Sequence, residues 1–217
     1  MRNITIIAVA IIALTTTASA NGPPPPKQAP RRAFMGLNVG YAHSAAAGNR
    51  IAASGWGPAF RGEFGYRLSS AVTLPYVTGG VTWSRGDAPA WEIGEGYPEP
   101  ARYFGLLATQ LTVGGYYRYP LKGDVLAAYA GPAFLAAWQR REVQTWYGGT
   151  MDENAGSGLG WAAVAGVEFA PGGGQTINFQ LLYGRTYSAW SDLPAGADDG
   201  FTFEQLQIGG AIRFFLF

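Results

Sequence analysis

Apolar and polar side chains alternate with a period of two along much of the sequence after Arg32, and this is the period of a β-strand. Between Phe60 and Leu68, one face is apolar and aromatic and the other carries Arg61, Glu63 and Arg67. Four further stretches repeat the alternation: Ala33 to His43, Leu107 to Tyr119, Trp161 to Phe169 and Thr176 to Tyr183. The pattern predicts strands with one apolar and one polar face.

Three more stretches have strand composition with a less regular alternation: Val72 to Trp83, Val125 to Trp138 and Phe201 to Leu216. The first two contain Pro75 and Pro132. Because proline cannot donate to a strand ladder, we expect a bulge or a locally frayed pair at each. The sequence therefore predicts eight strands in total.

The connections between these stretches alternate in length. Three are short: Ser69 to Ser70, Pro120 to Asp124 and Pro171 to Gln175. Four are long: Ser44 to Gly57, Ser84 to Glu99, Arg140 to Gly158 and Ser188 to Gly200. This alternation predicts an all-β fold, an eight-stranded antiparallel up-and-down barrel with turns at one end and loops at the other.

Such a barrel is either soluble, with its charged face in water, or embedded in a membrane, with its charged face inward. Tryptophan favours the membrane, since indole concentrates at the lipid interface. All seven tryptophans lie in or beside the long connections: Trp56, Trp83, Trp91, Trp138, Trp146, Trp161 and Trp190. The opposite girdle is predicted to comprise Tyr66, Tyr117, Tyr119, Phe169 and the C-terminal phenylalanines.

The membrane orientation brings the polar faces together inside the barrel. We expect ion pairs among Arg61, Glu63, Arg67, Arg118 and Glu168 to plug the lumen, because eight strands leave room for little more than side chains. Counting along the strand places Arg185 on the lipid face. An arginine costs about 2 to 4 kcal/mol at the bilayer midplane and little near the interface, so we expect Arg185 near the outer rim or after a bulge.

The last strand has two possible registers. If Phe217 is the closing aromatic residue, Phe215 and Arg213 both face lipid. If Phe214 is the closing residue, Arg213 faces the lumen and the residues facing lipid are Leu206, Ile208, Ile212 and Leu216. The cost of an arginine in lipid favours the second register.

The N-terminus has the features of a secretory signal peptide: Arg2, an apolar stretch from Ile4 to Leu14, and the cleavage pattern Ala18-Ser19-Ala20. The domain organisation expected is a cleaved signal peptide (1–20), a proline-rich periplasmic linker (21–32) and a barrel (33–217). There are no cysteines to form a disulfide or carry a lipid. Without Arg2, the 15 basic residues become 14 and equal the 14 acidic ones, so nucleic acid is not an expected partner.

The final strand, Leu206 to Phe214 (LQIGGAIRF), completes a resemblance to the small outer-membrane barrels of Gram-negative bacteria, the OmpA/OmpX-like group. The resemblance spans residues 33–217 and implies insertion by the barrel assembly machinery and contact with outer-membrane lipid and lipopolysaccharide. We expect it to depart from OmpA, with no peptidoglycan-binding domain after the barrel. Members of the group differ in role, so we expect a monomer with a structural or surface-interaction function through its outer loops, with a narrow passage for ions or small apolar molecules as the alternative.

Catalytic, metal and cofactor sites are not expected. Some barrels of this size modify lipid A with a histidine and a serine, but His43 and Ser44 are adjacent on a strand and face opposite ways. We expect His43 to be an interfacial or lumen-facing imidazole. The acidic clusters are expected to be solvated loop residues instead of cation ligands: Asp152 with Glu153, Asp198 with Asp199, and Glu92, Glu95 and Glu99.

Overall fold

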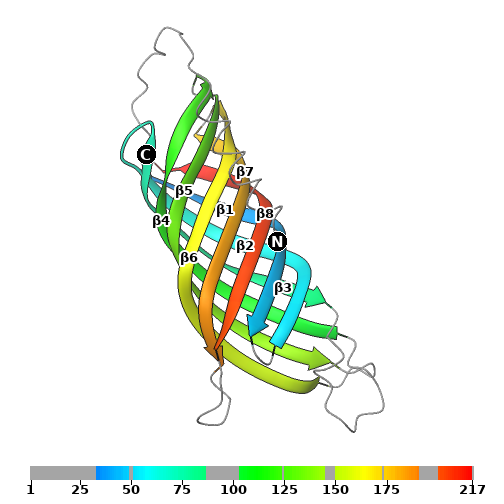
Figure 1. Cartoon of the computed structure of the whole chain (residues 1–217). Coiled ribbons are helices and arrows are strands. Elements are labelled where there is room, and N and C mark those ends of the chain that lie inside the picture. The colour runs from blue at the N-terminus through cyan, green and yellow to red at the C-terminus, as the bar shows by residue number, and fades with distance from the viewer. Residues whose placement is uncertain are drawn as a thin grey trace.

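The computed structural model is a closed barrel in which every strand is antiparallel to its neighbours (Figure 1). It describes residues 33–48, 51–86, 103–123, 125–144, 150–172, 174–190 and 200–216. The strands are β1 (Ala33–Gly48), β2 (Ile51–Arg67), β3 (Val72–Gly86), β4 (Tyr103–Lys122), β5 (Leu126–Gln144), β6 (Thr150–Gly172), β7 (Gln175–Trp190) and β8 (Gly200–Phe215). Each pairs with the next along the chain, and β8 pairs with β1 to close the barrel. The predicted fold class is confirmed. The expected signal peptide and linker lie outside the described residues and stay predictions.

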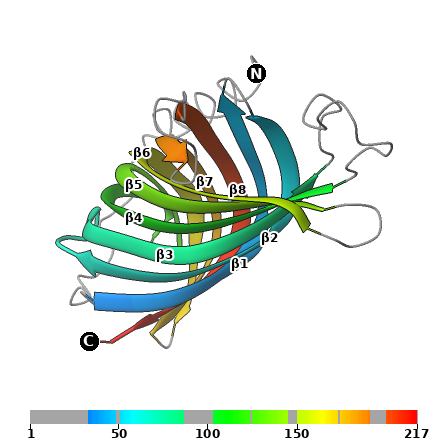
Figure 2. The same ribbon diagram turned by 90° about the horizontal axis from the view of Figure 1, so that it is seen from below.

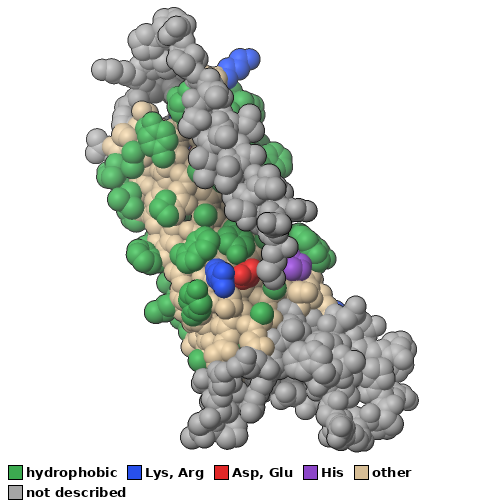
Figure 3. Space-filling view, viewed as in Figure 1, with side chains coloured by type: hydrophobic (Ala, Val, Ile, Leu, Met, Phe, Trp, Pro, Cys, Tyr) green, Lys and Arg blue, Asp and Glu red, His purple; other side chains and the backbone are tan. Residues whose placement is uncertain are grey.

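The two faces of the strands are oriented as in a membrane barrel. On β2, the side chains of Phe60 and Phe64 are 53% and 41% exposed, whereas Arg61 and Glu63 between them are each only 5% exposed. Hydrophobic side chains are spread over the outer wall in the space-filling view (Figure 3). This arrangement is the inverse of a soluble barrel, so the predicted orientation is confirmed. In the described part of the chain, no helix has the length and hydropathy to cross a membrane.

The three short connections form one end of the barrel, called here the turn end, and the opposite end is the loop end (Figure 2). Two of the four predicted long loops, Ser44 to Gly57 and Arg140 to Gly158, are wrong over most of their length because strands continue into them. β1 and β2 stay paired as far as Gly48 and Ile51, and β5 and β6 stay paired as far as Gln144 and Thr150. The ends of β1 and β2 are rich in alanine, glycine and serine, and the ends of β5 and β6 are rich in charged and polar residues. Neither composition alternates clearly, yet the backbone groups still pair across the ladder.

Both prolines interrupt a ladder as predicted. The pairing of β3 with β4 shifts register between Thr73 and Tyr76, which flank Pro75, so this strand is bulged. Beside Pro132, the pairing of β4 with β5 is interrupted between the pairs Gly114–Ala133 and Tyr117–Ala130, and it resumes in the same register. Pro132 therefore produces a locally frayed pair without a bulge.

Two clusters of buried side chains fill the ends of the barrel. At the turn end, Phe34, Tyr76, Tyr116, Tyr129 and Val164 pack together, with Phe215 against them. At the loop end the cluster consists of Ala46, Leu106, Ala108, Ala137, Phe201 and Phe203. The lumen between them is lined by buried polar side chains.

Candidate functional site: the lumen and the outer wall

Arg213 of β8 is the centre of a charged network at the turn end of the lumen. Its side chain is completely buried. Nε and Nη2 donate to Oε1 and Oε2 of Glu63, each at 3.0 Å, which is the bidentate geometry that makes arginine–carboxylate pairs strong. Nη1 reaches Oε2 of Glu168 at 3.4 Å and Oδ1 of Asn178 at 3.1 Å. One guanidinium therefore neutralises carboxylates from two strands.

Glu168 of β6 brings two more arginines into the network. Its Oε1 accepts from Arg67 at 2.5 Å and from Arg118 at 3.0 Å. The five predicted lumen residues are therefore all directed inward, and four of them join Arg213 in what we call the lumen plug: Glu63, Arg67, Arg118 and Glu168. Ion pairing in the lumen is confirmed for these four. The fifth, Arg61, donates to the side-chain carbonyl of Gln180 instead.

An aromatic cage surrounds the guanidinium of Arg213. Its central carbon lies 4.9 Å from the ring centroid of Phe34, 5.0 Å from that of Tyr129, and 5.6 Å from those of Tyr76 and Tyr116. Rings at this range stabilise a desolvated cation. Sequence reasoning missed the cage, although the inward positions of these residues follow from the alternation of their strands.

The direction of Arg213 decides between the two registers of β8. Ile208, Ile212, Phe214 and Leu216 are exposed on the outer wall, while Arg213 is inside, so the register closed by Phe214 is confirmed. Phe217 lies outside the described residues. The prediction that the terminal phenylalanines share a girdle is wrong for Phe215. Because it follows Phe214 by one residue, it faces inward and packs on Phe34, with ring centroids 5.5 Å apart.

Above the plug, hydrogen bonds link the polar side chains that line the lumen. Asn38 donates to Gln180 at 2.9 Å, and Gln180 donates to the hydroxyl of Tyr76 at 2.7 Å, which in turn donates to Glu63. Nearer the loop end, Ser44 accepts from Ser84 at 2.8 Å and from Gln205 at 3.0 Å. The interior is therefore a bonded polar core, and most of its side chains are excluded from water.

The outer wall carries an aromatic girdle near each end. Four tryptophans are exposed towards the loop end: Trp56, Trp83, Trp138 and Trp161. Trp91 and Trp146 lie outside the described residues, and the side chain of Trp190 is not described. At the turn end Tyr117, Phe169 and Phe214 are exposed, while Tyr66 and Tyr119 are half-buried. The two predicted girdles are present among the described residues.

Arg185 lies on the outer wall at the level of the tryptophans, as expected of a residue near the outer rim. It is directly opposite Trp161 of β6 on one side and Glu204 of β8 on the other. Its Nε is 3.5 Å from Oε1 of Glu204, a partner that sequence reasoning missed. An ion pair at the interface avoids the cost of a lone charge in lipid.

His43 and Ser44 are separated by the wall of the barrel. The imidazole of His43 is on the outside, with its centroid 5.0 Å from the Trp56 ring, whereas Ser44 is completely buried in the lumen. The pair cannot act as base and nucleophile. In the described part of the chain, no three histidine, cysteine or acidic side chains are grouped as metal ligands require. Of the acidic clusters, Asp198, Asp199, Glu92, Glu95 and Glu99 lie outside the described residues.

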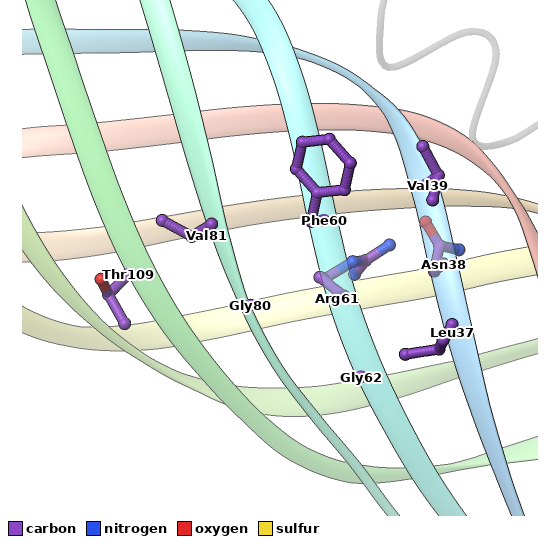
Figure 4. A pocket seen from close by; sticks show the side chains of 9 residues that line it. All are labelled: Leu37, Asn38, Val39, Phe60, Arg61, Gly62, Gly80, Val81 and Thr109. Carbon is purple, nitrogen blue, oxygen red and sulfur yellow. The ribbon is translucent and has the colours of Figure 1, made fainter.

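A hollow of about 410 Å³ lies on the outer wall over β1 to β4 (Figure 4). Leu37, Phe60 and Val81, which line it, are all exposed on the lipid-facing side. Its floor is thin because Gly62 faces Gly79 across the ladder, and a Cβ on Gly62 would meet no atom closer than 3.9 Å. Lipid acyl chains would fill this hollow in a bilayer. Sequence reasoning missed it, although a glycine on the apolar face of β2 is a visible signal.

A closed barrel with an apolar wall, two aromatic girdles and a charged interior defines a transmembrane barrel of the Gram-negative outer membrane. The sequence matches the family described as outer membrane protein beta-barrel domain over residues 6–214, and the chain belongs to that family. No curated protein matches the sequence.

Solved structures of small outer-membrane barrels are similar in fold. Neisserial surface protein A is 14% identical, with 84% of this chain and 97% of that chain covered and a TM-score of 0.49. The attachment invasion locus protein Ail of Yersinia pestis is 16% identical, with 84% and 99% covered and a TM-score of 0.43. OprG of Pseudomonas aeruginosa is 10% identical, with 84% and 96% covered and a TM-score of 0.49.

Proposed function

We propose that this protein is a monomeric, non-conducting and non-enzymatic barrel that presents its loop end to a partner outside the cell. The observation that carries the proposal is the closure of the lumen at both ends. The lumen plug and its aromatic cage fill the turn end, and the apolar cluster around Phe201 and Phe203 fills the loop end. A barrel closed in this way leaves its outer surfaces to perform the function.

The loop end is built as a rigid support for binding segments. β4, β5 and β6 are the longest strands, with 20, 19 and 23 residues, whereas about 9 to 11 residues cross a bilayer. Beyond Trp138, β5 continues through Arg140 and Glu142, whose exposed side chains pair at 3.6 Å. Connections held on such a scaffold are where binding residues concentrate. We propose that the walls contact outer-membrane lipid and lipopolysaccharide, and that β8 is the strand read by the barrel assembly machinery.

Planar-bilayer recording tests the closed lumen. We expect the purified protein to give no stable conductance steps, because the lumen is filled at both ends. Steps of ion-channel size from the unaltered protein would contradict the proposal. Exchange of residues 145–149 and 191–199 for glycine and serine tests the loops. We expect the barrel to remain folded in this variant. Cells that carry the unaltered protein should adhere to a partner surface, and cells that carry the variant should not.

The wall hollow favours a second candidate, passage of small apolar molecules. Gly62→Leu would fill the hollow without touching the plug, since Gly62 faces outward. The assay is uptake of a radiolabelled aromatic hydrocarbon into liposomes that contain the protein. Lower uptake with this variant would support transport, and unchanged uptake would show that the hollow takes no part in transport. Lipid A modification is the third and weakest candidate. We expect identical lipid A mass spectra from cells with and without the protein.

A further inference from the structure

Among the residues that the structure describes, one arginine of the lumen has no carboxylate partner. Arg61 of β2 is buried, and its Nη2 donates to Oε1 of Gln180 at 3.1 Å. Within the described part of the chain, its Nε and Nη1 are shielded from solvent and have no hydrogen-bond acceptor. A buried charge with unused donors is unstable unless a partner of opposite charge supplies them.

The carboxylates near Arg61 are already paired with other arginines. Glu63 lies two residues along the same face, but both of its oxygens accept from Arg213, and one also accepts from the hydroxyl of Tyr76 at 2.5 Å. Glu168 is shared among Arg67, Arg118 and Arg213. In the plug and the layer above it, the described side chains comprise four arginines and two glutamates, so this part of the lumen has an excess of positive charge.

The backbone beside Arg61 makes room for its side chain. In the cross-strand row, Gly80 of β3 lies directly between Arg61 and Gln110 of β4. A Cβ on Gly80 would lie 2.2 Å from Cγ of Arg61, so the arginine occupies the space that a side chain at position 80 would need. Nε2 of Gln110 is a second buried donor that lacks a partner among the described residues. The row thus contains donors without acceptors.

We propose that the lumen binds a small inorganic anion, of the size and charge of a halide, at Nε and Nη1 of Arg61. A monovalent anion would satisfy the unused donors and reduce the excess positive charge. The ion is a resident of the closed lumen, so the proposal does not depend on whether the loop end binds a partner.

Halide-dependent stability tests the site. The midpoint temperature of unfolding in detergent is measured at constant ionic strength while sodium gluconate is replaced by sodium chloride or bromide. Because a ligand that binds only the folded state stabilises it by mass action, the midpoint should rise with halide concentration. It should still rise in Arg67→Met, which removes one lumen charge that is already paired and leaves the donors of Arg61 in place, and should not rise in Arg61→Met. An equal rise in all three proteins, or no rise in the unaltered protein, would overturn the proposal.

A crystal structure of the unaltered protein in bromide tests the anion site even if Arg61→Met fails to fold. An anomalous peak within hydrogen-bonding distance of Nε or Nη1 of Arg61 in the unaltered protein is the expected result. Anomalous density at the surface only, with water beside Arg61, would mean that hydration satisfies the donors and that no anion site exists. Arg61→Lys provides a milder variant, which keeps the charge but has different donor geometry and should show a smaller halide shift.

Discussion

Replacement of Arg213 by methionine removes the cation on which the lumen plug is built. Glu168 would keep Arg67 and Arg118, but Glu63 would lose both charge-assisted hydrogen bonds and keep only its contact with Tyr76. Breaking a buried ion pair from one side costs about 3 to 5 kcal/mol, because the remaining charge is left desolvated. We therefore expect Arg213→Met to lower the free energy of unfolding by about 3 to 5 kcal/mol.

The matched control removes both charges of the pair. In the double variant Glu63→Gln with Arg213→Met, no unpaired charge remains at position 63, and much of the lost stability should return. The measurement is equilibrium unfolding by urea in detergent or lipid vesicles, followed by tryptophan fluorescence. A single variant within about 1 kcal/mol of the unaltered protein would refute the reasoning, as would a double variant no more stable than the single one.

Three further outcomes follow from the structure. The unheated protein should migrate differently from a boiled sample on a detergent gel, since the closed barrel resists denaturation; identical mobility would argue against closure. Gly80→Ala should destabilise the barrel by about 1 to 3 kcal/mol in the same unfolding assay, because its Cβ would overlap Arg61 and the carbonyl of Phe60. Gly79→Ala is the matched control and should be nearly neutral, because a Cβ there would meet no atom nearer than 4.0 Å. Arg185→Leu should change the unfolding free energy by less than about 1 kcal/mol because Arg185 and Glu204 are partly exposed at the interface, and a loss above 2 kcal/mol would place them deeper in lipid.

The fold could be predicted because lipid imposes a strict period on each strand. Arg61 and Glu63 alternate with Phe60 and Phe64, and a single shift of register would place charge in lipid. The same energy argument gave the direction of Arg213. The constraint vanishes where side chains are small, as at the ends of β1 and β2, and where both faces are polar, as at the ends of β5 and β6. The sequence pattern therefore predicts loops where these strands in fact continue.

The contacts between side chains inside the lumen were harder to predict than the face of the strand on which each side chain lies. The inward direction of Glu168 follows from its own strand, but its contact with Arg67 depends on which strands meet across the barrel and at what height. Those relations are set by the stagger of all eight ladders together. The cage around Arg213 and the hollow over Gly62 depend on the same long-range geometry. The sequence indicates which way their residues face but not that they meet.

The position of Arg213 on β8 ties electrical neutrality to barrel closure. β8 is the last strand to leave the ribosome, and β1 is the first strand of the barrel, so the ladder between them forms only when the whole sheet is present. Until then, Glu63 on β2 has no bidentate cation, and Phe34 on β1 lacks its contact with Phe215. An incompletely closed sheet is therefore left with an uncompensated acid and an exposed aromatic ring at the same seam. Pairing of β8 with β1 neutralises the acid and buries the ring in the same step, so both are satisfied only in a complete barrel.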